Sequence, residues 1–100
     1  MVKKKDGSVE PFDREKLILG ITSATKKRAV SLSEIETIVD GIENRMDNEL
    51  RSEISTAEIG DSVLASLKEI DLVAYVRFAS VYKDFNDLDS FISIITELSL

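Results

Sequence analysis

Apolar residues recur every three or four positions through most of this chain, which is the pattern of amphipathic helices. The first such run follows Asp13, whose carboxylate can accept hydrogen bonds from the free amides at the start of a helix. Its apolar members are Leu17, Ile18, Ile21 and Ala24. The pattern therefore predicts a helix that begins after Asp13 and ends near Arg28.

Two capping boxes, at residues 31–34 and 55–58, predict the starts of two longer helices. In such a box the leading serine accepts a hydrogen bond from the amide three residues later. The apolar residues after the boxes are Ile35, Ile38, Val39, Ile42 and Met46 in the first helix, and Ile59, Val63, Leu64, Leu67 and Ile70 in the second. Asp71 then separates the second helix from the next.

The C-terminal third of the chain predicts two more helices. From Leu72 to Phe85 apolar residues fall on most sides of a helical wheel, which is typical of a helix surrounded by neighbours. Asn86 and Asp87 can cap a final helix. Its apolar residues are Leu88, Phe91, Ile92, Ile95 and Leu98.

Short strands are predicted at two places. Residues 1–12 indicate a β-hairpin around residues 5–8, because the Asp6-Gly7 pair readily adopts the backbone angles of a hairpin turn. Leu50 to Ile54 predicts a third strand. We find no internal repeat or linker, so we expect an α+β fold in a single domain spanning residues 1–100, with a bundle of four to five helices capped by a small three-stranded sheet.

Composition excludes many functions. Without cysteine or histidine the chain has no disulfide, no thiolate metal site, no thiol nucleophile and no imidazole base, so we expect no enzyme and no metal-binding site of its own. No apolar run approaches the ~20 residues that cross a membrane, and we expect a soluble, cytoplasmic protein. The net charge of −6 argues against broad nucleic-acid binding.

Positive charge is concentrated at two places. Lysines at positions 3, 4 and 5, followed by Lys16, surround the predicted hairpin and the start of the first helix. A second basic group, residues 26–28, comes where that helix is expected to end, and cations there complement the helix dipole. The first group offers a local site for an anion, whereas the second is explained by capping.

The N-terminal segment brings unlike chemical groups together. Alternation along a strand places Val2 and Lys4 on one face, and the hairpin returns Glu10 to them. The helix start adds Asp13, Lys16 and Leu17. Such a set can hold an adenine between apolar residues, with lysines on its phosphates. Taken alone, however, composition and spacing favour a hairpin whose lysines simply remain in water, and no phosphate-binding glycine loop is present.

Two longer motifs carry a family resemblance. Residues 2–7 (VKKKDG) and 10–17 (EPFDREKL) resemble the signature that opens ATP-cone domains. Residues 73–85 (VAYVRFASVYKDF) resemble the second signature of the version found in the bacterial repressor of ribonucleotide reductase genes. The resemblance covers nearly the whole chain. It implies an allosteric regulatory domain that binds ATP or dATP without consuming it, linked to ribonucleotide reductase or to its transcriptional control.

The resemblance also implies roles for particular residues. Val2 and Leu17 would sandwich the base, Glu10 would read the adenine amino group, and Asp13 would lie near the ribose. Lys4, Lys5 and Lys16 would hold the phosphates, with Mg²⁺ bound through them. The remaining positions assigned to the nucleotide are Thr56, Gly60, Tyr82 and Lys83. Simpler roles stay open for three of these. Thr56 can be an ordinary helix-start residue, Gly60 a packing glycine and Tyr82 a member of the core.

The chain departs from the repressor family, because the cysteines of a zinc ribbon are missing and direct DNA binding is therefore not expected of this chain alone. Lys5 stands where arginine is common, which keeps the charge but loses a planar fork. We expect the bound nucleotide to control self-association or contact with a larger regulated protein. The alternative is a helical protein-interaction module whose nucleotide pocket is unused. Hydrolysis by Glu10 and Asp13 is disfavoured because nothing evident positions water.

Overall fold

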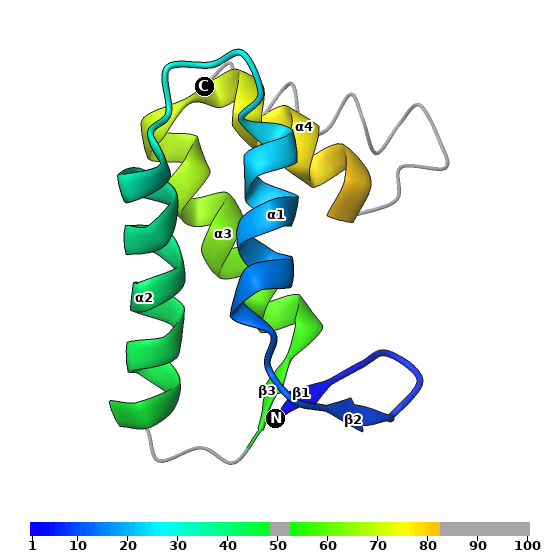
Figure 1. Ribbon diagram of the computed structural model, residues 1–100. Coiled ribbons are helices and arrows are strands. Elements are labelled where there is room, and N and C mark those ends of the chain that lie inside the picture. Colours follow the sequence, from blue (N-terminus) through cyan, green and yellow to red (C-terminus); the bar gives the residue numbers. More distant parts are fainter. Residues whose placement is uncertain (49–52, 83–100) are drawn as a thin grey trace.

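Four helices and three very short strands make up the parts of the chain that the computed structural model describes, residues 1–48 and 53–82. In chain order they are β1 (Val2–Lys3), β2 (Val9–Glu10), α1 (Arg14–Ala24), α2 (Leu32–Asn48), β3 (Ile54–Ser55), α3 (Thr56–Ile70) and α4 (Leu72–Tyr82). Figure 1 shows the helices bundled together and the strands gathered at one end of the bundle. The α+β architecture is as predicted.

The sheet has the strand order β2-β1-β3, with β1 in the centre. Val2 lies opposite Glu10 in the antiparallel pair with β2 and opposite Ile54 in the parallel pair with β3. The hairpin turn is where the sequence predicted it. Gly7 has a φ of 87°, which favours glycine, and the Asp6 carboxylate accepts hydrogen bonds from the amide and hydroxyl of Ser8.

The third strand differs from the prediction of Leu50 to Ile54. Within the described residues this strand begins at Ile54 and continues through Ser55. Residues 49–52 are not among the residues that the structure describes. β3 pairs in parallel with β1, with Val2 opposite Ile54 and Lys3 opposite Ser55, so the two-residue length of β1 sets both ends of β3. Ser55 also caps α3, since its hydroxyl accepts a hydrogen bond from the amide of Glu58 at 3.1 Å.

The capping predictions for α1 and α2 are confirmed. Asp13 accepts a hydrogen bond from the amide of Lys16 at 3.1 Å, and Ser31 accepts one from the amide of Glu34 at 3.1 Å. The predicted end of α1 near Arg28 was wrong, because the helix stops at Ala24. Lys27 has a φ of 63°, a left-handed conformation that cannot continue a right-handed helix.

The second basic group therefore lies in the loop between α1 and α2, and not in the last turn of α1 as the dipole argument required. Arg28 instead forms an ion pair with Asp71, with Nε 2.9 Å from Oδ2. Arg77 of α4 donates a hydrogen bond to the carbonyl oxygen of Lys26 at 2.7 Å. These contacts tie the α1–α2 loop to the junction between α3 and α4 and to the middle of α4.

The core lies between the helices, with its largest fully buried side chains being Ile21, Val39, Val63 and Leu67. α4 packs chiefly against α3 and α1. The sequence predicts an α4 that is surrounded on most sides, but Leu72, Val73 and Val81 are exposed. The continuation to Phe85 and the final predicted helix lie outside the described residues. None of the described helices has the length and apolar character to cross a membrane.

Candidate functional site

A cavity of about 250 Å³ lies where the hairpin, the start of α1 and the start of α3 meet. In Figure 1 this is the junction of the sheet with the helices above it. Of the residues predicted to bind a ligand, those that line the cavity are Val2, Glu10, Asp13, Lys16, Leu17 and Thr56. The structure therefore brings residues from three separate segments of the chain to one place.

The walls of the cavity are largely apolar. Val2 is 5% exposed, because its side chain belongs to the core cluster, whereas Lys3, the next residue of the same central strand, is exposed. Leu17 packs against the core from α1, and Ile59, 9% exposed, comes from the first turn of α3. Apolar side chains from three separate elements suit one ring of a ligand.

Several lining residues were missed by sequence reasoning, namely Pro11, Phe12, Gly20 and Ile59. Helical spacing could have found Gly20, because it follows Lys16 and Leu17 by four and three residues on the same face of α1. Pro11 and Phe12 lie within the motif that carries the family resemblance. The helical pattern assigns Ile59 only to the core.

Two acidic side chains in the cavity walls, Glu10 and Asp13, have partners in the structure, and Lys4, the partner of Glu10, is not itself a lining residue. Lys4 Nζ lies 3.0 Å from Glu10 Oε2, in an ion pair whose side chains are 43% and 39% exposed. Such exposed pairs contribute about 0–1 kcal/mol, so a ligand can replace this one at little cost. The Asp13 side chain lines the cavity, and its Oδ1 also caps α1.

Arg14 anchors the beginning of α1 from outside the cavity. Its Nη1 lies 2.6 Å from Glu43 Oε1 and 2.8 Å from Asp40 Oδ1, both on α2. The hydrogen bonds to Glu43 and then to Asp40 raise the pKa of Arg14 above its usual value. The first turn of α1, with Lys16 and Leu17, is thereby fixed against α2.

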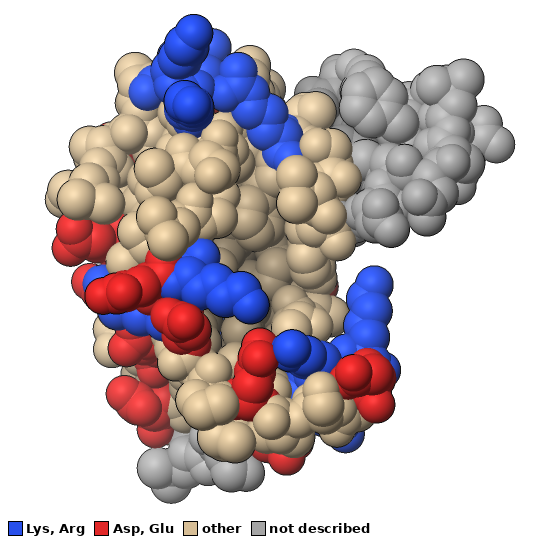
Figure 2. All heavy atoms as spheres, turned by 45° about the vertical axis from the view of Figure 1, so that its right-hand side comes forward, with Lys and Arg blue, Asp and Glu red and all other residues tan. Residues whose placement is uncertain are grey.

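Lys5 is exposed in the hairpin turn and does not line the cavity. Figure 2 shows basic and acidic side chains interleaved over the hairpin and a second basic group at the opposite end of the molecule, where the α1–α2 loop lies. Positive charge near the cavity is thus local, as the sequence predicted. Lys83 lies outside the described residues.

Gly60 and Tyr82 are close to each other, but neither lines the cavity. The Tyr82 ring lies over Gly60, and its hydroxyl donates a hydrogen bond to the carbonyl oxygen of Ala57 at 2.9 Å. Direct contact of these two residues with a ligand therefore stays a prediction.

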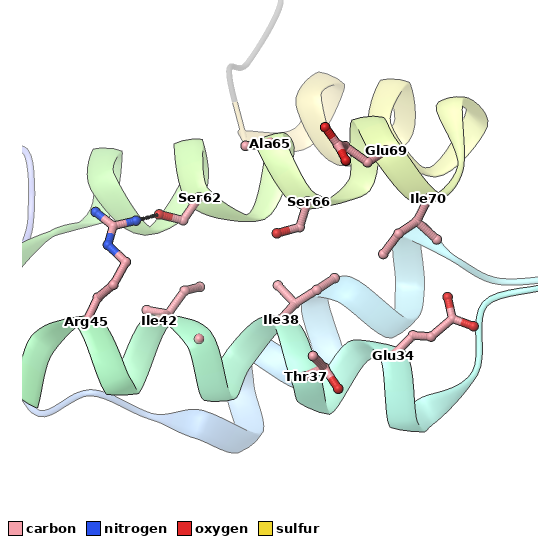
Figure 3. Close-up of a pocket in the computed structure, with 11 residues that line it drawn as sticks. Glu34, Thr37, Ile38, Ile42, Arg45, Ser62, Ala65, Ser66, Glu69 and Ile70 are labelled. Atoms are coloured by element: carbon pink, nitrogen blue, oxygen red, sulfur yellow. Dashed lines mark hydrogen bonds between the residues drawn. The ribbon is translucent and has the colours of Figure 1, made fainter.

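A larger hollow of about 620 Å³ runs between α2 and α3. Figure 3 shows Ile38, Ile42 and Ile70 along it, and the Arg45 guanidinium reaching across to the Ser62 hydroxyl at 2.7 Å. No predicted binding residue lines this hollow. It differs from the smaller cavity in having no lysine in its walls.

A protein-family model described as the ATP cone domain matches residues 1–88. The chain belongs to the ATP-cone family. The cavity of this ATP-cone is built from the motif at residues 10–17, which carried the resemblance, and from the start of α3.

Curated relatives of this ATP-cone include proteins called transcriptional repressor NrdR. The one from Petrotoga mobilis is 58% identical over 95 residues, and the one from Fusobacterium nucleatum is 53% identical over 97 residues. These matches cover 95% and 97% of this chain but only 63% and 65% of the relatives. The chain thus spans a little less than two thirds of their length.

Proposed function

We propose that this ATP-cone chain is a non-catalytic regulatory domain that binds ATP or dATP in the cavity between the hairpin, α1 and α3. One observation carries the proposal. Val2, Leu17 and Thr56, which are far apart in the sequence, line a single cavity together with the cation Lys16. An apolar cleft with a few convergent polar groups is the usual form of a small-molecule site.

The size of the cavity supports a binding mode in which only part of the nucleotide lies inside it. A volume of about 250 Å³ is below the ~300–1,000 Å³ of sites that enclose a whole drug-sized ligand. We therefore place the adenine inside, between Val2 and Leu17, and the phosphates outside it. There they meet Lys4, Lys5 and Lys16 close to the first turn of α1, where free amides and the helix dipole favour anions.

Glu10 is proposed to accept a hydrogen bond from the adenine amino group. In this binding mode Glu10 moves from Lys4 to the adenine, which frees the Lys4 ammonium group for a phosphate. The exchange is balanced, because each partner of an exposed ion pair gains a charge-assisted contact with the ligand. We place Asp13 beside the ribose, and Mg²⁺ enters with the nucleotide on its phosphates, since the lysines around them are donors and not metal ligands.

The output of the domain is proposed to be a change in self-association or in contact with a larger regulated protein, in the transcriptional control of ribonucleotide reductase. The relatives named as transcriptional repressors support this context. A second candidate, a helical interaction module with an unused cavity, is favoured by the exposed apolar residues of α4, Leu72, Val73 and Val81, which are 50%, 40% and 83% exposed.

Calorimetric titration with ATP, dATP and GTP distinguishes the two. We expect both adenine nucleotides to bind, and Lys16→Ala to weaken ATP binding by about 1.5–3 kcal/mol through the loss of a charge-assisted contact. Lys26→Ala is the matched control, because it removes the same charge from the loop at the opposite end. Equal affinities in both variants would place the nucleotide elsewhere, and the absence of any binding would favour the interaction module.

A further inference from the structure

Tyr82, at the end of α4, lies across the first turns of α3. Its hydroxyl donates to the carbonyl oxygen of Ala57 at 2.9 Å, and its ring covers Gly60. An ideal Cβ built on Gly60 would lie 2.7 Å from ring atom Cδ1 and closer still to Cε1 and Cζ. This approach is open only to glycine unless the ring moves away.

The tyrosine ring is also held from its own helix. Phe78, one turn earlier on α4, stacks against it with ring centroids 6.1 Å apart and an interplanar angle of 25°. Burial, and secondarily the charge of Asp61, raise the pKa of Tyr82, so its hydroxyl stays protonated and remains a donor at neutral pH. The contact between the two helices therefore has a defined geometry.

The same turn of α3 forms one wall of the cavity. Thr56 and Ile59 line it, while Ala57 and Gly60, each the next residue along the chain, carry the contact with Tyr82. Hydrogen bonding within a helix makes one turn move as a unit. A displacement of Ala57 and Gly60 must therefore also displace the cavity wall.

We propose that Tyr82 is a positioning residue for the cavity, which fixes the first turn of α3 through Gly60 and Ala57 and links the cavity to the end of α4. The link to ligand binding rests on the proposed function. Coupling of this kind is reciprocal, so a ligand that moves Thr56 or Ile59 alters the Tyr82 contact by the same free energy with which that contact alters ligand affinity.

The contact between Tyr82 and Gly60 is tested by asking whether the effect of Gly60→Ala on thermal stability changes sign when the Tyr82 ring is removed. Alanine normally favours a helix over glycine, so Gly60→Ala should stabilise α3 wherever there is space for the new methyl group. We expect Gly60→Ala to lower the midpoint of thermal unfolding in the parent chain and to raise it in a Tyr82→Ala background. Val81→Ala is the control for an exposed neighbour on the same turn. An effect of the same sign in both backgrounds would overturn the proposal.

Tyr82→Phe, which keeps the ring and removes the hydroxyl, tests positioning. Without nucleotide, the methyl resonances of Thr56 and Ile59 should move in this variant and stay in place in Val81→Ala. ATP affinity should fall by about two- to tenfold, since one neutral hydrogen bond sets the upper limit. Unmoved resonances would overturn the positioning role. Failure of the parent chain to bind ATP would instead contradict the proposed function, and the resonances would still decide the role of Tyr82.

Discussion

Replacing Glu10 by glutamine separates base recognition from phosphate binding. The substitution keeps the size and shape of the side chain but removes its charge and adds a donor. The new side-chain amide can still accept a hydrogen bond from the adenine amino group, more weakly, and it can now donate to the carbonyl oxygen that guanine carries at the equivalent ring position. The preference for ATP over GTP should therefore fall.

The magnitude follows from the contacts of Glu10. Its ion pair with Lys4 is exposed, so losing it should lower the free energy of unfolding by no more than about 1 kcal/mol. The difference between a charge-assisted and a neutral hydrogen bond is about 1–2 kcal/mol, which corresponds to a loss of roughly 5- to 30-fold in the ATP to GTP affinity ratio.

Calorimetric titration of both nucleotides into the parent and the Glu10→Gln variant measures this ratio directly. Release of Lys4 from its ion pair changes the affinity for any triphosphate alike, so the effect on Lys4 cancels in the ratio. Thermal unfolding provides the control for an intact fold. A variant that discriminates ATP from GTP as strongly as the parent would show that Glu10 does not read the base.

Three further predictions concern stability and assembly. Ser55→Ala should lower the free energy of unfolding by about 1 kcal/mol in denaturant titrations, because it removes the cap of α3. An equal loss is not expected from Ser33→Ala, because the cap of α2 is Ser31 and not Ser33. Hydrogen bonds from the amide of Ala74 and then from Arg28 lower the pKa of Asp71. The Asp71 carboxylate should therefore stabilise the fold above the unfolded pKa of about 3.9, and this contribution should be lost as the pH falls through the lower folded pKa. Asp71→Asn should flatten this part of the profile of unfolding midpoint against pH. The particle mass measured by light scattering should differ between the nucleotide-free, ATP-bound and dATP-bound chain, and identical masses over a wide concentration range would mean that a separate partner reads the bound state.

Local chemistry explains which elements could be predicted from the sequence. The hairpin turn depends on Asp6 and Gly7, and the starts of α1, α2 and α3 depend on Asp13, Ser31 and Ser55. In each case the interacting groups are within three residues of one another. Such patterns act in the same way whatever the rest of the fold does, and all four are found in the structure.

Elements that depend on distant residues were predicted less well. α1 does not continue to Arg28, because Lys27 has a left-handed conformation and Arg28 is bound to Asp71, 43 residues away. The environment of α4 was also misjudged, because apolar residues on most sides of a helix do not reveal which sides have neighbours. The contact between Gly60 and Tyr82 was not predicted for the same reason, because the sequence around each residue does not indicate which distant residue it will contact.

The short sheet joins the part of the cavity formed by residues close in sequence to the part that comes from the distant start of α3. Residues 10–17 form their part of the cavity through proximity in the sequence, but Thr56 arrives only because β3 pairs in parallel with β1. Ile54 lies opposite Val2, and α3 begins at Thr56 with no intervening loop. The register of this pairing therefore decides how far the first turn of α3 reaches along the cavity. A shift of one residue would turn the side chain of Ile54 out of the core and displace both Thr56 and the turn on which Tyr82 rests.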